Sequence, residues 1–262
     1  MNRLVRLALF SAAVFITIVV GLDACAAEKA AKLIPARIAV VSRSTLDLPF
    51  WVAREQGFFR EEGIDGEIIL FRASLAVQAM IGGSVDFGTA TGTALSAAVN
   101  GADGSFMSLR AGVVDAVMLQ IPATFLAQDE GFRKIAVGAD YYRAVQGGLA
   151  ATKTFLAEKP EVATKVIRAT QRALRLLKND KKYAIEALTK KNYVELGKER
   201  ERFAERAYEA AMQGYSLTGV VDEKLQREMI TVAAQRVKSL PQLASERIFD
   251  FSFARKASEG LR

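Results

Sequence analysis

The fold is decided by residues 46–71, which read LDLPFWVAREQGFFREEGIDGEIILF. Pro49 opens a helical pattern and Gly57 ends it, because Pro favours the first turn of a helix and Gly favours its C-terminal stop. After Gly63, an apolar run of strand length follows at residues 67–71. The stretch therefore predicts a helix that leads into a buried strand.

Strands and helices alternate on both sides of this stretch. A compact β-branched run precedes it at residues 37–41, and a helical pattern follows at residues 75–81, with Ser74 as the expected N-cap. Residues 84–88 form the next expected strand. Alternation at this short spacing predicts βαβ units and a mainly parallel sheet, so the expected fold class is α/β.

A weak internal repeat extends the pattern. Residues 78–94, QAMIGGSVDFGTATGTA, resemble residues 107–123, MSLRAGVVDAVMLQIPA, at an offset of 29 residues. Each copy runs from a helix end through a Gly stop and Val-Asp into a short apolar strand, and then into a turn that opens another helix, at residues 92–100 and 122–130. Either two lobes share one supersecondary unit, or Gly-x-Val-Asp is a common connector between a helix and a strand.

The rest of the chain is helical in pattern. Pro160 opens a long amphipathic helix, and further helices are expected at residues 180–190, 198–212 and 222–238, the last with Asp222 as its N-cap. The apolar stripe of the long helix consists of Val162, Val166, Ala169, Ala173, Leu176 and Leu177. We expect these stripes to be core-packing faces.

Composition excludes several classes of function. The chain of 262 residues contains 36 Lys and Arg, 29 Asp and Glu, one Cys and no His. Without His there is no Ser-His-Asp or Cys-His catalytic unit and no imidazole ligand, and one Cys excludes an intrachain disulfide and a Cys-built zinc site. We therefore expect no enzyme activity, no metal and no cofactor.

The charge balance is basic, with a formal net charge of +7. Much of the excess lies in the helical C-terminal part, where it forms either a solvated helix face or a surface that attracts small anions and anionic lipid headgroups. Nucleic acid is not an expected partner, because no basic stripe is interleaved with aromatic residues.

Residues 1–27 have the pattern of a secretory signal peptide. Two arginines precede an uncharged run at residues 7–22, and small residues follow up to Ala27. One alternative is a membrane anchor, although this run is shorter than the roughly 20 residues that cross a bilayer. The other is lipidation at Cys25, because residues 22–25 resemble a bacterial lipobox. Each places the folded part outside the cytoplasm, and we expect it in the periplasm.

Residues 46–71 and 76–102 resemble the first lobe of the solute-binding proteins of nitrate/sulfonate/taurine-type ABC importers. That superfamily also includes the binding proteins for thiamine-pyrimidine precursors. Later stretches resemble it in the same order, at residues 109–132, 147–177 and 249–257. The resemblance implies a two-lobed periplasmic-binding-protein-like fold. It also implies a monomeric protein that closes on a small solute and presents it to an ABC permease in the inner membrane.

The chain departs from this family after Gly101. The family normally continues with a crossing strand and the first β-α-β portion of lobe two, whereas residues 101–105 run straight into the next helix. We therefore expect a first α/β lobe at residues 36–104, a remnant of the second lobe at 105–152 and a helical region at 153–262. A truncated, non-transporting envelope protein is the alternative function. A pyrimidine-synthase-like enzyme is disfavoured, because that relative uses His in its chemistry.

The expected ligand site lies at the carboxyl ends of the strands, where ligands of open α/β sheets bind. Hydroxyls beside the N–H groups of helix N-termini suit a sulfonate, nitrate, carboxylate or phosphate group, and a guanidinium adds a charge-assisted hydrogen bond. A pyrimidine-like solute is the other expected class. The candidate ligand-binding residues are Arg43, Ser44, Thr45, Phe50, Trp51, Arg72, Ser74, Thr91, Thr93 and Gln120.

Some of these residues have a second interpretation. Ser74 and Thr91 can equally serve as helix N-caps, and Trp51 either stacks on a flat ligand or fills the core. Asp86 and Asp115 lie at strand entrances, away from the expected site. We therefore expect them to make capping or turn hydrogen bonds rather than to bind a ligand.

Overall fold

A computed structural model describes residues 32–89, 102–119, 121, 123–141, 145, 147–190, 193–194, 198–236 and 244–261. All elements below belong to the unit Ile34–Arg262, and of the preceding unit only residues 32 and 33 are described. The expected leader at residues 1–27 and the expected helix at residues 92–100 lie outside the described residues.

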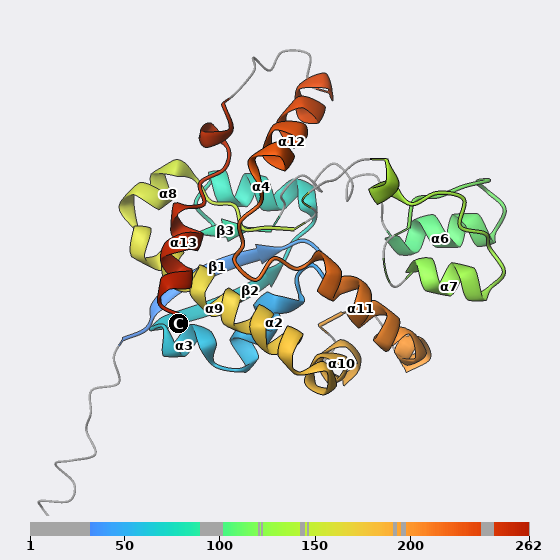
Figure 1. Ribbon diagram of the computed structural model, residues 1–262, viewed down its shortest axis with the longest axis horizontal. Helices are drawn as coiled ribbons and strands as arrows, with labels where there is room; N and C mark the ends of the chain where they lie inside the picture. The colour runs from blue at the N-terminus through green and yellow to red at the C-terminus, as the bar shows by residue number, and fades with distance from the viewer. Residues whose placement is uncertain are drawn as a thin grey trace, which may run out of the picture. The chain divides into compact units, whose positions relative to one another are not determined.

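A parallel sheet with the strand order β2-β1-β3 lies at the centre of the first α/β part (Figure 1). The strands are β1 (Ile34–Val40), β2 (Ile64–Leu70) and β3 (Phe87–Gly88). β1 pairs with β2 over its whole length but with β3 at only two positions, Ile38 with Phe87 and Ala39 with Gly88. The predicted parallel pairing is confirmed, although β3 is shorter than the expected strand.

β1 begins earlier than the sequence pattern predicts and includes Pro35. The N–H of Ile34 donates to Gly63 O on the β2 side at 2.9 Å. The backbone N–H groups of successive residues in a strand point alternately toward its two neighbouring strands, so the backbone nitrogen of Pro35 points toward the β3 side. β3 does not reach that far along β1. The missing N–H of Pro35 therefore costs no ladder hydrogen bond.

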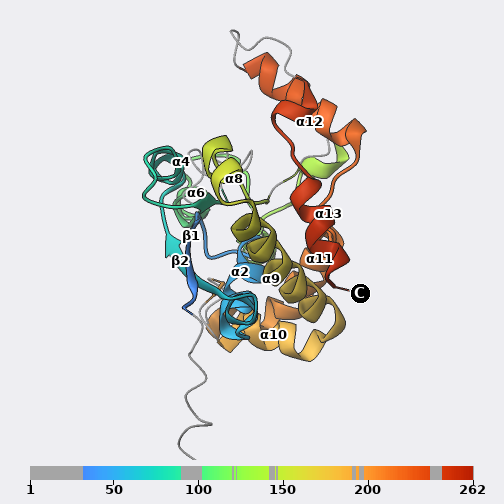
Figure 2. The ribbon, with the colours of Figure 1, turned by 90° about the vertical axis from the view of Figure 1, so that its left-hand side faces the viewer.

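Helices cover both faces of the sheet, and β1 contributes alternate residues to each. Ile38 and Val40 pack with α2 (Leu48–Glu55) and α9 (Pro160–Asn179), whereas Ala39 packs with α4 (Ala73–Ile81). Figure 2 shows α2 and α9 on the same side of the sheet. The predicted apolar stripe of α9 is confirmed as a core face, because Val162, Val166, Ala169, Ala173 and Leu177 are all buried.

The C-terminal ends of α2 and α4 follow the expected glycine signals, whereas the start of α4 does not lie where the sequence predicts it. Gly57, after α2, and Gly83, after α4, have φ values of 75° and 73°, the left-handed conformation that favours Gly. The expected N-cap at Ser74 is wrong. The backbone of Arg72 is extended (φ −71°, ψ 138°) and occupies the N-cap position, so α4 begins one residue before Ser74.

The repeat predicted from the sequence has the same turn geometry in both copies. Gly83 N donates to Met80 O at 3.2 Å, and the next N–H, that of Ser84, donates to Ala79 O at 2.8 Å. The second copy, after α6 (Ala102–Arg110), has equivalent bonds from Gly112 N to Leu109 O at 3.1 Å and from Val113 N to Ser108 O at 2.9 Å. The strand expected after the second turn does not form: residues 113–119 belong to no strand.

α6 packs against α7 (Ala123–Asp129) (Figure 1). The rings of Phe106 and Phe132 meet edge to face with centroids 6.0 Å apart, and Arg110 forms an ion pair with Glu130 at 2.9 Å. A short 3₁₀ helix, Gly138–Asp140, follows. In the described residues between 102 and 152, the only β contact is an isolated antiparallel bridge from Ala150 to Gly88.

The C-terminal part is helical, as expected. Its elements are α8 (Lys153–Glu158), α9, α10 (Lys181–Lys190), a 3₁₀ helix (Lys198–Phe203), α11 (Ala204–Gly214), α12 (Glu223–Arg236), a second 3₁₀ helix (Ser245–Arg247) and α13 (Ser252–Glu259). Asp222 is confirmed as the N-cap of α12, since its Oδ1 accepts the N–H of Leu225 at 2.8 Å. Within the described ranges, no helix is long and apolar enough to span a bilayer.

Candidate functional site

The loop between β1 and α2 lies at the carboxyl edge of the sheet and carries the first group of predicted ligand residues. The hydroxyls of Ser42 and Ser44 lie 2.8 Å apart in a hydrogen bond. Ser44 Oγ also accepts the N–H of Leu46 at 3.3 Å. These bonds are local and fold the loop back on itself, so its serine hydroxyls gather at the end of β1.

The buried side chain of Asp47 holds this loop in place through hydrogen bonds. Its side chain accepts hydrogen bonds from Ser42 N at 3.1 Å and from Ser42 Oγ at 2.9 Å, and the residue is only 2% exposed. Burial raises the pKa of the Asp47 carboxyl above its ordinary value, and hydrogen bonding to Thr89 and Ser42 opposes the rise. Thr89 follows β3, so Asp47 joins the ends of two neighbouring strands.

The hydroxyl of Thr89 is buried at the same edge. It contributes to the pKa of Asp47, but Thr89 Oγ1 has no hydrogen bond of regular geometry to any described residue. Buried hydroxyls are normally paired, so this group has hydrogen-bonding capacity left for a further partner.

Tyr215, at the C-terminal end of α11, ties the helical region to this loop. Its hydroxyl donates to Thr45 O. Burial raises the pKa of Tyr215 above its ordinary range, and the neighbouring Asp47 carboxylate raises it further. The phenol therefore stays protonated and acts as a fixed donor to the loop backbone.

The structure places four of the ten predicted ligand residues directly after the ends of β1 and β2, two in α2 and one in α4. Arg43 and Arg72 are exposed, Ser44 is half-buried and Thr45 is buried. Ser74 lies in the first turn of α4, and its side chain is outside the description. Thr91, Thr93 and Gln120 lie outside the described residues.

The two aromatic candidates, Phe50 and Trp51, contact the hydrophobic core. Phe50 is 6% exposed, and the ring of Trp51 stacks on Tyr193 with centroids 5.6 Å apart and an interplanar angle of 8°. The indole N–H of Trp51 is buried without a hydrogen-bond partner in the described part of the chain. Their packing supports the core-filling interpretation over stacking on a flat ligand.

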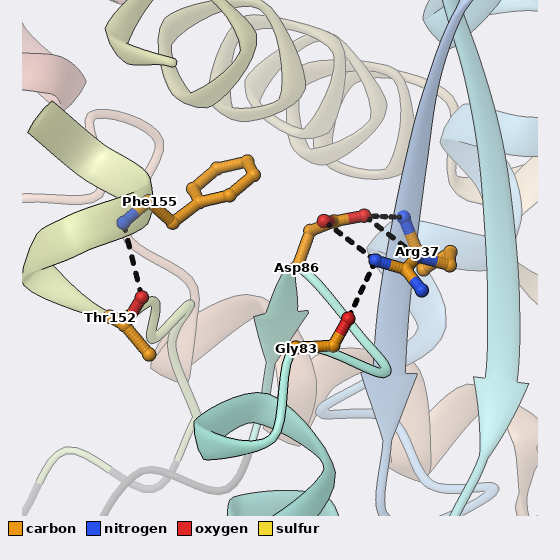
Figure 3. A network of polar contacts seen from close by, with 5 residues as sticks. All are labelled: Arg37, Gly83, Asp86, Thr152 and Phe155. Atoms are coloured by element: carbon orange, nitrogen blue, oxygen red, sulfur yellow. Dashed lines mark hydrogen bonds and ion pairs between the residues drawn. The ribbon is translucent and has the colours of Figure 1, made fainter. Parts of the chain in front are cut away.

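Asp86 lies at the opposite, entrance edge of the sheet, as predicted, but its carboxylate bonds Arg37 of β1 instead of a turn or a helix end (Figure 3). Its Oδ2 accepts Arg37 N at 2.8 Å and Arg37 Nε at 3.1 Å, while Arg37 Nη2 donates to Gly83 O at 2.9 Å. The hydrogen bond to Asp86 raises the pKa of Arg37. The corresponding residue in the second copy, Asp115, is exposed and makes no capping or turn hydrogen bond to the residues that the structure describes.

The segment after residue 147 crosses back onto β3. Ala150 bridges Gly88, and the ring of Phe155 meets that of Phe87 edge to face, with centroids 5.0 Å apart. Thr152 Oγ1 accepts the N–H of Phe155 at 3.1 Å and caps α8 (Figure 3). This packing connects the sheet to the long helix α9 that follows.

The described residues leave a small cavity beside β3 and an open hollow elsewhere. The first measures about 10 Å³ and is lined by Ala76, Val77, Met80, Gly88 and Ala150. The second measures about 600 Å³ and is lined by Arg175, Thr218, Val220, Arg255, Ser258 and Glu259. No three acidic or sulfur-bearing side chains gather as a metal site within the part of the chain that the structure describes.

Sequence reasoning missed two groups at the carboxyl edge, Asp47 and Tyr215. Asp47 directly precedes the Pro-containing helix start, which marks it as a candidate N-cap, but its side chain bonds Ser42 and caps no helix N–H. Tyr215 contacts a residue 170 positions away, so no local pattern could have identified it.

The raised pKa of Asp47 predicts a pH effect on stability. The folded pKa lies above the unfolded one, so the folded state holds its proton to a higher pH, and stability falls as the pH rises from about 4 through the folded pKa. We expect Asp47→Asn, which keeps an acceptor for Ser42, to lose this decline in denaturant titrations across that pH range. Asp65→Asn, at an exposed position on β2, should keep the wild-type profile. Parallel profiles for Asp47→Asn and wild type would contradict the prediction.

Comparison with known proteins identifies related sequences and folds. Residues 45–103 match the model of the family described as NMT1/THI5 like. A solved structure from Bordetella bronchiseptica RB50 has a TM-score of 0.75 and 19% identity over 88% of this chain and 98% of that chain. A putative sulfonate ABC transporter, periplasmic sulfonate-binding protein from Methylobacillus flagellatus KT has a TM-score of 0.59 and 15% identity over 88% and 95%. No curated protein sequence matches the chain.

These likenesses confirm the predicted resemblance to the solute-binding proteins and the α/β periplasmic-binding-protein-like fold with a parallel sheet. The family match begins at Thr45 and ends at Asp103, so it includes only the last three residues of the loop before α2, together with α2, β2, α4 and β3. It ends two residues after Gly101, the point at which the sequence departs from the expected pattern.

Proposed function

We propose that the chain is the extracytoplasmic substrate-binding component of an ABC importer and binds a small solute without transforming it. The observation that carries this proposal is the gathering of hydroxyl groups at the carboxyl edge of a parallel sheet, where ligands of such sheets bind. Ser42, Ser44 and Thr89 lie on this edge, and the family match, which begins at Thr45, includes Thr89.

The chemistry of this edge favours a small anion, such as a sulfonate, nitrate or taurine-like solute, with a pyrimidine-like solute as the second class. Exposed guanidiniums of Arg43 and Arg72 follow β1 and β2 and are suited to charge-assisted hydrogen bonds. Asp47 lies behind the serine hydroxyls and accepts hydrogen bonds from Ser42. Thr91, Thr93 and Gln120 are proposed to complete the site.

The proposal includes a place in the cell and a partner. A signal peptide at residues 1–27, with lipidation at Cys25 as the alternative, would export the chain to the periplasm. There a ligand-closed form would present the solute to a permease in the inner membrane. Mass spectrometry of the exported protein's N-terminus distinguishes cleavage after Ala27 from a lipid on Cys25.

A truncated, non-transporting envelope protein is the alternative function, and one observation favours it. Among the described residues between 102 and 141 there is no strand, and Val113 and Met118 are 74% and 72% exposed. A second lobe of residues 105–152 with no sheet of its own would leave a ligand cleft incomplete.

Thermal-shift screening separates the two functions. The purified protein is melted with sulfonates, taurine, nitrate, aliphatic acids and pyrimidines, and any hit is followed by small-angle scattering. A binder melts at a higher temperature with at least one solute and becomes more compact. A cooperative melt that no solute shifts supports the non-transporting alternative.

A further inference from the structure

Two segments beside α6 and α7 have the composition of buried strands but lie exposed. The acidic segment, residues 113–118, follows α6, and the basic segment, residues 133–137, follows α7. Val113 and Met118 in the first and Ile135 in the second are each more than 70% exposed. Figure 1 draws both segments as loops rather than arrows. Large apolar side chains left exposed in short neighbouring stretches of the chain are candidates for an interaction surface.

Most backbone groups of both segments have no hydrogen-bond partner among the residues that the structure describes. Within the described part of the chain, residues 114–118 and 133–136 make no backbone hydrogen bond. Strand-like segments with free N–H and C=O groups are templates for pairing with another strand. Apolar side chains and open backbone therefore coincide in the same two segments.

The first α/β part shows how such sequences behave when they are paired. Lys134-Ile135-Ala136-Val137 repeats the pattern of Arg37-Ile38-Ala39-Val40 in β1, and Val114-Asp115 repeats Val85-Asp86. Arg37 N donates to the carboxylate of Asp86, and Ile38, beside it, is completely buried. Asp115 and Lys134 are the matching acid and base, and both are exposed.

The charges of the two segments indicate which partner binds them. The acidic segment carries Asp115 and no basic residue, whereas the basic segment carries Arg133 and Lys134 and no acidic residue. Two identical segments of either kind would place like charges opposite each other. A two-fold axis instead pairs the acidic segment of each copy with the basic segment of the other, and forms the same contact twice.

We infer that this surface joins two copies of the chain, with the acidic segment of each paired to the basic segment of the other. Asp115 of one copy meets Lys134 of the second in the way that Asp86, directly before β3, meets Arg37 of β1. The pairing covers Val113, Met118 and Ile135 in both copies.

Sedimentation equilibrium of the purified protein tests this inference with a charge swap. The wild type should have the mass of two copies. Asp115→Lys and Lys134→Asp, both at exposed positions, should each raise the dissociation constant by ~10-fold or more. The double variant should recover the pairing. Glu158→Lys, an exposed charge change at the end of α8, is the matched control and should stay paired.

Mixing the two single variants gives the sharpest result. In a mixed pair, Asp115 of one chain meets Lys134 of the other, and the introduced Lys meets the introduced Asp, so two chains that fail to pair alone should pair together. A single-copy mass for the wild type at every concentration, the result expected for a monomer, would overturn the inference. Recovery in the double variant but not in the mixture would also overturn it, because the segments would then pair within one copy. So would loss of pairing in Glu158→Lys.

Discussion

Gly66→Ala is expected to lower the free energy of unfolding by up to about 3 kcal/mol. Gly66 lies in β2 directly against the ring of Phe59, which is almost fully buried under α2 and α9. A Cβ at residue 66 would lie 2.5 Å from Phe59 Cδ2 and 2.8 Å from Phe59 Cγ. Real Cβ atoms do not approach a ring so closely, so the ring or the strand must move.

Urea titration of the wild type, the two single variants Gly66→Ala and Phe59→Leu, their double variant and one control measures this effect. In the background of Phe59→Leu, which removes the ring, Gly66→Ala should cost clearly less than it does in the wild type, because neighbouring substitutions are not additive. Gly138→Ala is the matched control, since a Cβ there meets no atom within 4 Å. Equal costs for Gly66→Ala in both backgrounds, or an equal cost for Gly138→Ala, would refute the steric argument.

Gln171→Met is expected to destabilise the protein by about 2–3 kcal/mol, because it removes a buried amide at nearly constant volume. The residue lies on α9 and is 2% exposed. Its Nε2 lies 2.8 Å from Thr218 O, 3.1 Å from Ala254 O and 3.0 Å from Ser258 Oγ. Ala254 O also accepts a hydrogen bond from Ser258 Oγ and keeps that bond in the variant. Thr218 O, in contrast, loses the hydrogen bond that Gln171 donates to it.

The same substitution should loosen the C-terminal helix. Gln171 connects α9 to α13 and to the loop before α12, so amide hydrogen exchange should become faster in both segments while β1 and β2 keep their protection. Gln213→Met, at an exposed position of α11, should change stability by no more than about 0.5 kcal/mol. Equal losses at the two positions would contradict this role for Gln171.

Local signals predicted the elements that the fold depends on most. Pro49 and Gly57 bracket α2, and the stripe from Val162 to Leu177 faces the core, because helix ends and amphipathic periods are encoded within a few residues. The N-cap of α4 was misassigned because Ser74 has the right side chain but the wrong backbone conformation. A residue type does not reveal which of two neighbours leaves the helix.

The site was only partly predictable, because its parts come from distant positions. The serines after β1 could be found from the rule that ligands bind at the carboxyl ends of strands. The contact of Tyr215 with Thr45 depends on how α11 packs, which no local pattern encodes, whereas Asp47 bonds Ser42 within the same loop. The second copy of the repeat formed the expected turn at Gly112 but no strand, because a strand needs a neighbour to pair with.

Titration calorimetry on protein refolded to remove any carried solute is the most direct test of solute binding at the carboxyl edge. We expect a saturable, one-to-one heat with at least one sulfonate, nitrate or pyrimidine, and an affinity that falls by ~10–100-fold in Arg72→Ala, which removes an exposed guanidinium after β2. Arg60→Ala, on α3 (Phe58–Glu61) before the entrance of β2, should bind as the wild type does. Folded protein that gives no heat with any of these solutes, or equal losses in the two variants, would contradict the account.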